Sequence, residues 1–147
     1  MEIEDLNSIL VSIVERRMEL GRLSYSDKNY DDLEEELHNI EDEFVDNFGK
    51  QMEDVFHEIH QKYCPDTDVL SPIAYLAKNY HKVGKFTNGT AQYDIPDLKQ
   101  GVVIDSDEYE QAYLVLIPNP VRVLLTVPKN ALKEEVWNIQ QENTPAV

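Results

Sequence analysis

The sequence predicts an α+β fold, in which an N-terminal antiparallel helical hairpin precedes a small C-terminal antiparallel β-sheet or barrel with short helices. Up to residue 63, apolar residues recur at alternating spacings of three and four, which is the period of a helix face. After Cys64, prolines, glycines and β-branched runs predominate, as is typical of strands and turns. The strands do not alternate with long helices, so a parallel sheet is not expected. These signals predict an acidic helical hairpin over residues 1–64 and a β-rich unit over 65–147, as two parts or as one continuous domain.

The first helix is expected to begin close to the N-terminus and to end near Gly21. Acidic residues at its start lie where the helix dipole favours negative charge. Gly21 and the polar stretch 24–29 then favour a stop and a turn. The residues of its mainly apolar face are three or four apart: Ile3, Leu6, Leu10, Ile13, Arg17 and Leu20.

The second helix is expected to run from about Asp31 to Tyr63, because Pro65 cannot continue the pattern. Gly49 lies in the middle of this stretch and costs about 1 kcal/mol relative to alanine, so the pattern allows a break there. The short connection to the first helix favours an antiparallel hairpin.

The second helix is predicted to be longer than the first, at roughly 50 Å against roughly 30 Å for about 1.5 Å per residue. Its overhang carries apolar side chains that something must cover: Phe48, Met52, Phe56 and Ile59. Two structures could cover them: the C-terminal unit of the same chain, or a second copy across a two-fold axis. In the second case these four residues form a partner-binding surface, and the protein is a homo-oligomer.

The C-terminal unit is predicted to hold four or five short strands. Ser71-Pro72 predicts the start of a short helix that ends before Gly84, and Asn88-Gly89 is typical of a hairpin turn. The clearest hairpin joins residues 112–117 to residues 121–127, with Arg122 and Thr126 making one face of the second strand only partly apolar. Residues 129–138 are expected to form a final helical turn or two.

The charge of the chain restricts its partners. The formal net charge is −16, and residues 1–63 hold 18 acidic and 6 basic side chains. Such a surface repels phosphate backbones and anionic membranes, so neither nucleic acid nor a membrane is the expected partner. No apolar run approaches the roughly 18 residues of a membrane span. With a single cysteine and no signal-like start, we expect a cytoplasmic protein.

Glu53, His57 and His60 are the candidate metal ligands. Together with Cys64 they follow one another at steps of four, three and four residues along the second helix. Imidazole, carboxylate and thiolate are zinc ligands, but residues 53 and 64 lie about 16 Å apart along the axis. The site would therefore use His57 with His60 or Glu53 and take its next ligand from His81 or the acidic loop 105–110. The alternative is a polar shoulder beside the apolar stripe, with the cysteine as a small hydrophobe.

Other chemistry has weaker support in the sequence. No glycine-rich phosphate loop and no nucleophile elbow is present. Basic residues alternate with aromatic residues over 78–86, which would suit a single strand of nucleic acid if they did not simply balance neighbouring acids.

We therefore expect a non-enzymatic interaction or adaptor protein that uses its acidic amphipathic hairpin for self-association or for binding a protein partner. The four overhang residues would supply the binding energy, and the acidic segment 34–46 would steer a basic partner. Two alternatives remain open at this point. One is a metal-binding protein or metalloenzyme built on His57 and His60. The other is an inhibitor whose acidic helices mimic nucleic acid.

Overall fold

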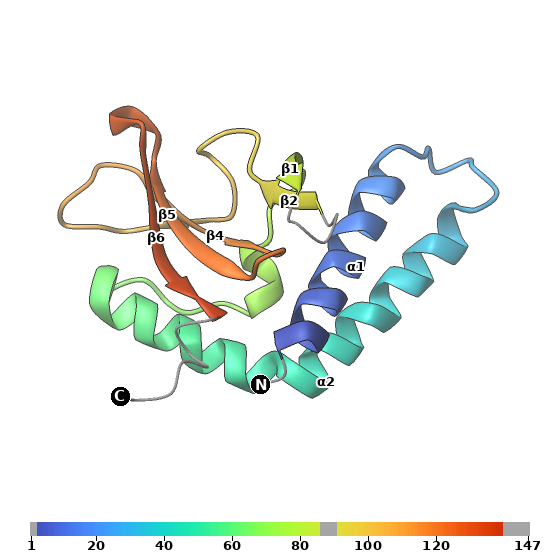
Figure 1. The fold of residues 1–147 in the computed structure, drawn as a ribbon, viewed down its shortest axis with the longest axis horizontal. Helices are drawn as coiled ribbons and strands as arrows, with labels where there is room; N and C mark the ends of the chain where they lie inside the picture. Colours follow the sequence, from blue (N-terminus) through green and yellow to red (C-terminus); the bar gives the residue numbers. More distant parts are fainter. Residues whose placement is uncertain (1–2, 86–90, 140–147) are drawn as a thin grey trace.

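The computed structural model describes residues 3–85 and 91–139 and has the predicted α+β architecture (Figure 1). Two helices, α1 (Ile3–Gly21) and α2 (Tyr30–Tyr63), form the hairpin. They are followed by the 3₁₀ turn η1 (Pro72–Tyr75) and by a two-stranded pair, β1 (His81–Lys85) and β2 (Ala91–Asp94). The remaining elements are β3 (Val102–Ile104), β4 (Ala112–Ile117), β5 (Arg122–Val127), η2 (Pro128–Asn130) and β6 (Leu132–Asn138).

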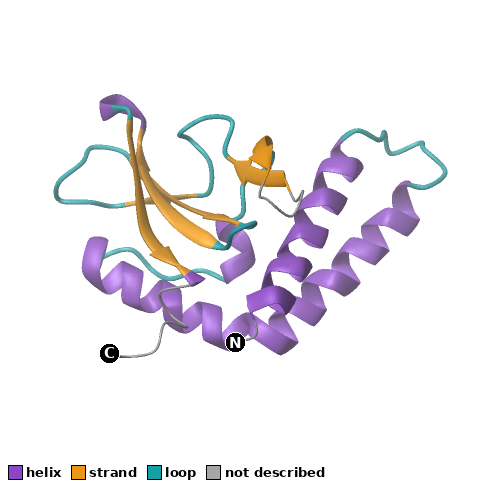
Figure 2. Ribbon diagram, in the orientation of Figure 1, coloured by secondary structure: helices purple, strands orange, loops and turns teal. Residues whose placement is uncertain are grey.

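The apolar stripe of α1 packs as its spacing predicts, since Leu6, Leu10 and Ile13 are fully buried. α2 is one continuous helix, so the break that Gly49 allows is not found. The helix instead changes direction along its length. Its first half runs beside α1, and its second half runs beneath the sheet (Figures 1 and 2).

Ion pairs join the two helices of the hairpin across their exposed flank. Arg16 Nε donates to Glu36 Oε1 at 2.9 Å, and Arg17 Nη2 lies 3.2 Å from Glu41 Oε1. The second pair is the more shielded of the two. Pairs of this kind add little stability at an exposed site, so the hairpin is held mainly by its apolar seam.

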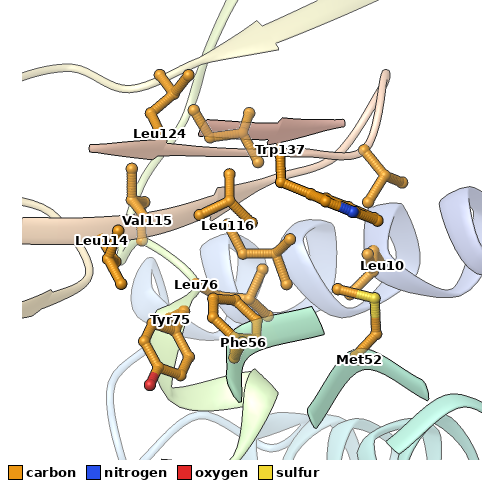
Figure 3. Close-up of a cluster of buried hydrophobic side chains, with 14 of the residues drawn as sticks. Leu10, Met52, Phe56, Tyr75, Leu76, Leu114, Val115, Leu116, Leu124 and Trp137 are labelled. Atoms are coloured by element: carbon orange, nitrogen blue, oxygen red, sulfur yellow. The ribbon is translucent and has the colours of Figure 1, made fainter. Parts of the chain in front are cut away.

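The main sheet has four antiparallel strands in the order β3-β4-β5-β6, and its two central strands are buried on both faces. One face packs on the second half of α2, and Leu124 lies on the side of the sheet away from Met52 and Phe56 (Figure 3). On that far side the segment between β2 and β3 reaches the sheet, because Thr126 Oγ1 donates to the Leu98 carbonyl at 2.8 Å.

The face of β5 that carries Arg122 and Thr126 is as buried as the other, although the sequence predicts it to be only partly apolar. Its polar groups are satisfied by backbone carbonyls. The Arg122 guanidinium donates to the carbonyls of Tyr93 at 2.6 Å and Pro120 at 2.8 Å. Burial of a charge is tolerated when such hydrogen bonds replace water.

The final helix predicted over residues 129–138 is wrong. A short 3₁₀ turn is followed there by strand β6, which pairs along β5 from Leu132 opposite Val127 to Asn138 opposite Arg122. The free edge of β5 offers a row of backbone groups that need partners, and this requirement outweighs the helical spacing of a few apolar residues.

The predicted short helix after Ser71-Pro72 is reduced to the single turn η1, after which Leu76 pairs with Leu116 in an isolated bridge. β1 and β2 are antiparallel, with His81 opposite Asp94. The turn predicted at Asn88-Gly89 between them lies outside the described residues.

One hydrophobic core joins the hairpin and the sheet. Its side chains come from α1 and α2, from η1 and from the strands, as seen in Leu10, Met52, Tyr75, Leu116 and Trp137 (Figure 3). In the described part of the chain, neither helix has the length and the apolar character that crossing a bilayer requires.

Candidate functional site

The overhang of α2 is covered by the sheet of the same chain, which is the first of the two covers that the sequence left open. Met52 and Phe56 are fully buried and Ile59 is nearly so, and all three belong to the hydrophobic core. They are therefore not available to a partner in this structure. Phe48, the fourth predicted contact residue, is only partly buried.

Phe48 lies in a groove between α1 and α2, which we call the hairpin groove. The groove has a volume of about 470 Å³. Its apolar floor is made by Phe48, Ile9 and Ile40, each partly exposed. Its rim is polar and acidic, and is formed by Asp5, Ser8, Ser12, Glu43 and Asn47.

The local sequence explains why a groove forms at this place. Ser8 and Ser12 are four residues apart and therefore lie on the same face of α1. Their short side chains fill little of the space beside α2. On α2, Ile40 and Phe48 flank the buried Phe44, whose ring lies 6.3 Å from that of Phe48. Ile40 and Phe48 therefore form an apolar strip that is accessible to solvent.

The hairpin groove is surrounded by negative charge. Two of its lining residues, Asp5 and Glu43, are acidic, and none is basic. The segment 34–46 of α2 contains seven acidic residues. Glu36 and Glu41 are neutralised by arginines of α1, whereas the other five acids of this segment form no ion pair with any residue that the structure describes. Uncompensated carboxylates on one flank attract cationic groups over about a Debye length.

The candidate metal ligands do not converge. Glu53 and His57 are both more than half exposed, with Oε1 and Nε2 3.6 Å apart. His60 is buried and points into the protein. Among the residues of ranges 3–85 and 91–139, no three histidine, cysteine or carboxylate side chains are grouped so that they could hold a metal ion.

Both ring nitrogens of His60 are used in hydrogen bonds. Nδ1 lies 2.8 Å from the Thr67 carbonyl, which can only accept, so Nδ1 carries a proton. In the neutral ring, Nε2 then accepts from the Tyr75 hydroxyl at 2.8 Å. That hydroxyl in turn accepts from the Leu70 amide at 3.1 Å. Tyr75 also stacks on Phe56, with centroids 3.8 Å apart. The hydrogen bonds of His60 thus connect the end of α2 to residues 67–75.

Cys64 caps the end of α2 and is buried. Burial, with a smaller contribution from the Asp105 carboxylate, raises the pKa of its thiol to about 11. The side chain is therefore a neutral thiol at neutral pH, whereas a metal ligand or a nucleophile must be a thiolate.

The described part of the chain does not bring either proposed source of a third ligand into a metal-binding group with His57. His81 begins strand β1. The acidic loop 105–110 lies against the end of α2, where the Asp105 amide donates to Thr67 Oγ1 at 2.8 Å. The loop lines a separate acidic hollow of about 660 Å³, whose lining does not include His57.

Sequence reasoning found Phe48 of the hairpin groove and, within the acidic segment 34–46, Glu43, but it missed the α1 wall. The missed residues are Asp5, Ser8, Ile9 and Ser12. A signal was present, because two serines four residues apart beside an apolar stripe leave a depression in a helix surface. Comparisons of the chain with protein-family models, with curated proteins and with solved structures found no match.

Proposed function

We propose that this is a non-enzymatic interaction protein whose hairpin groove binds a basic, amphipathic segment of a protein partner. One observation carries the proposal, namely that an apolar floor and a polar rim whose charged residues are both acidic occur in the same groove. An amphipathic helix laid into a groove by its apolar face is a common mode of peptide recognition.

The chemistry of the groove defines the partner. A leucine or phenylalanine of the partner would cover Ile9, Ile40 and Phe48 and remove their exposed surface from water. Lysine or arginine residues beside it would meet Asp5 and Glu43 at the rim and the unpaired acids of segment 34–46 farther out. The apolar contact would supply most of the affinity, and the charges would supply orientation and rapid encounter.

The charge of the groove favours a different protein over a second copy of this chain. A contact across a two-fold axis places the same patch on both sides of the interface. Two hairpin grooves would then bring Asp5 and Glu43 of both copies together, and like charges in contact oppose association. The overhang that first suggested self-association is already covered within the chain.

The test uses a fluorescent peptide that forms a helix with leucines on one face and lysines on the other, and a peptide of the same composition in shuffled order. We expect the amphipathic peptide to bind more tightly and to weaken steeply between low and high salt, because the rim contacts are exposed ion pairs. The double variant Asp5→Lys/Glu43→Lys should bind about tenfold or more weakly, as measured by fluorescence anisotropy.

The matched control is Asp66→Lys/Asp107→Lys, which makes the same change in net charge at exposed residues of the distant acidic hollow. It should reduce binding by no more than about threefold, since it alters only the long-range field. Equal losses in the two variants, or equal binding of the two peptides, would show that the groove is not the docking site.

A further inference from the structure

On one surface of this acidic protein, basic residues outnumber acidic ones. Three adjoining hollows lie along the C-terminal half of α1, the segment after η1 and the loop 97–101, and neighbouring hollows share lining residues such as Arg17, Met18 and Lys78. They are lined by six of the 13 basic residues of the chain: Arg16, Arg17, Arg22, Lys78, Lys82 and Lys99. Among the residues that the structure describes, three acids line them: Glu15, Glu19 and Asp97.

Part of this positive charge is not compensated. Arg16 and Arg17 pair with acids of α2, and Lys82 Nζ lies 3.9 Å from Glu15. Lys78 and Lys99 are exposed and form no ion pair within the described ranges. The Lys78 amide donates to Gln100 Oε1 at 3.2 Å, which ties Lys78 to the loop that carries Lys99. Within that loop, the Lys99 amide donates to Asp97 Oδ1 at 2.8 Å.

Lys78 and Lys99 line the same open cavity of about 980 Å³, which we call the lysine cavity. Five apolar side chains contribute to its wall: Ile73, Ala74, Leu76, Leu98 and Pro128. The one acid in the wall, Asp97, is engaged from within the loop by the Lys99 amide and by Gln100 Nε2 at 2.9 Å. These two hydrogen bonds, with a smaller contribution from the charge of Lys99, lower the pKa of Asp97 and keep its carboxylate ionised.

This combination does not suit a strand of nucleic acid. Single strands bind to basic grooves in which exposed aromatic rings stack on the bases. Within the described ranges, the aromatic residue that lines these hollows is Tyr80, which is buried and whose hydroxyl donates to the Leu116 carbonyl at 2.6 Å. A bare inorganic anion would leave the apolar wall exposed to water. An apolar wall beside unpaired ammonium groups instead suits one molecule that has both characters.

We propose that the lysine cavity binds a small amphipathic anion, with its carboxylate held by Lys78 and Lys99 and its apolar body against Leu76 and Leu98. A cavity of this size is in the range that accommodates small organic ligands. The lysine cavity shares no residue with the hairpin groove. A test of ligand binding in this cavity is therefore independent of the proposed function.

The experiment titrates the full-length protein with octanoate and, separately, with 1-octanol, while amide and methyl resonances are followed by NMR. Octanoate should bind with a Kd below about 1 mM and shift resonances of residues 73–78 and 97–101. The uncharged alcohol should bind about tenfold more weakly, because it cannot form charge-assisted hydrogen bonds with the ammonium groups. The variant Lys78→Gln/Lys99→Gln should weaken octanoate about tenfold and leave octanol unchanged.

The control variant Lys28→Gln/Lys50→Gln removes the same charge from exposed lysines outside the lysine cavity. It should leave the affinity for octanoate within about twofold of the parent protein. Three results would overturn the proposal: no saturable binding of octanoate, equal affinity for acid and alcohol, or an equal loss in both lysine variants.

Discussion

His60 shows how one side chain can look like a metal ligand in sequence and act as a structural fastener in the fold. Its spacing from His57 places both on neighbouring positions of α2. The curvature of the helix surface nevertheless separates them into an exposed residue and a buried one. Both nitrogens of the buried ring form hydrogen bonds, one with the Thr67 carbonyl and one with the Tyr75 hydroxyl. A helical spacing fixes which residues are neighbours, but the packing decides what each of them faces.

At this scale we predict that His60→Leu lowers the free energy of unfolding by about 2 kcal/mol, because the Thr67 carbonyl and the Tyr75 hydroxyl lose their partner in a poorly solvated site. The matched substitution His57→Leu, at an exposed position, should change it by less than about 0.5 kcal/mol. Urea unfolding of both variants measures the difference. Equal effects would mean that the hydrogen bonds of His60 contribute nothing specific.

The entry to strand β3 depends on a glycine. Gly101 has a φ of +91°, a conformation that side chains rarely adopt, and a Cβ there would collide with the Leu114 carbonyl of β4. This backbone conformation and the close approach of the β4 backbone therefore require glycine at this position. The same loop forms the wall of the lysine cavity, so the conformation of Gly101 also sets the shape of that site.

For the element β3 we predict that Gly101→Ala destabilises the protein by about 3 kcal/mol or more, since both the backbone conformation and the contact with β4 must change. Gly21→Ala serves as the control, because nothing lies within 4 Å of the position where its Cβ would be built. That change should be neutral or stabilising by up to about 1 kcal/mol at the end of α1. Thermal unfolding of the two variants tests the contrast, which fails if Gly101→Ala is tolerated.

The two helices could be predicted from the sequence and strand β6 could not, because their apolar patterns differ in length. The stripes of α1 and α2 extend over many turns, so their period is unambiguous. Residues 132–138 have only Leu132, Val136 and Trp137 as apolar markers, and these fit a short helix as well as a bulged strand. Pairing with the open edge of β5 favours the strand over the helix, and that edge exists only in the assembled sheet.

At the scale of the whole molecule, the hairpin and the sheet depend on each other. The core is shared between them, and the half of α2 beyond α1 has its apolar side against the sheet (Figures 1 and 3). Phe56 is in contact with Tyr75, and Trp137 from the last strand is part of the same cluster. The boundary near residue 64 is thus a change of secondary structure across one continuous core.

We predict that residues 1–64, produced alone, do not remain a monomeric hairpin. Without the sheet, Met52, Phe56 and Ile59 would be exposed as one apolar patch, which drives association or loss of the second half of α2. Circular dichroism and sedimentation should show concentration-dependent association or reduced helix content. Replacing those three residues by serine in the fragment should restore a monomer. A monomeric fragment with full helix content would show that the sheet is not required.

Local sequence patterns are sufficient to predict the extent of both helices, the strands of the main hairpin, and the strongly acidic character of α2. These depend on periodicity and composition, which are properties of neighbouring residues. The folded chain was needed to find that the sheet covers the overhang, that β6 is a strand, and that basic residues from separate segments line the lysine cavity. The physical reason is that burial, edge pairing and local charge depend on contacts between segments far apart in the chain, and no local pattern encodes those contacts.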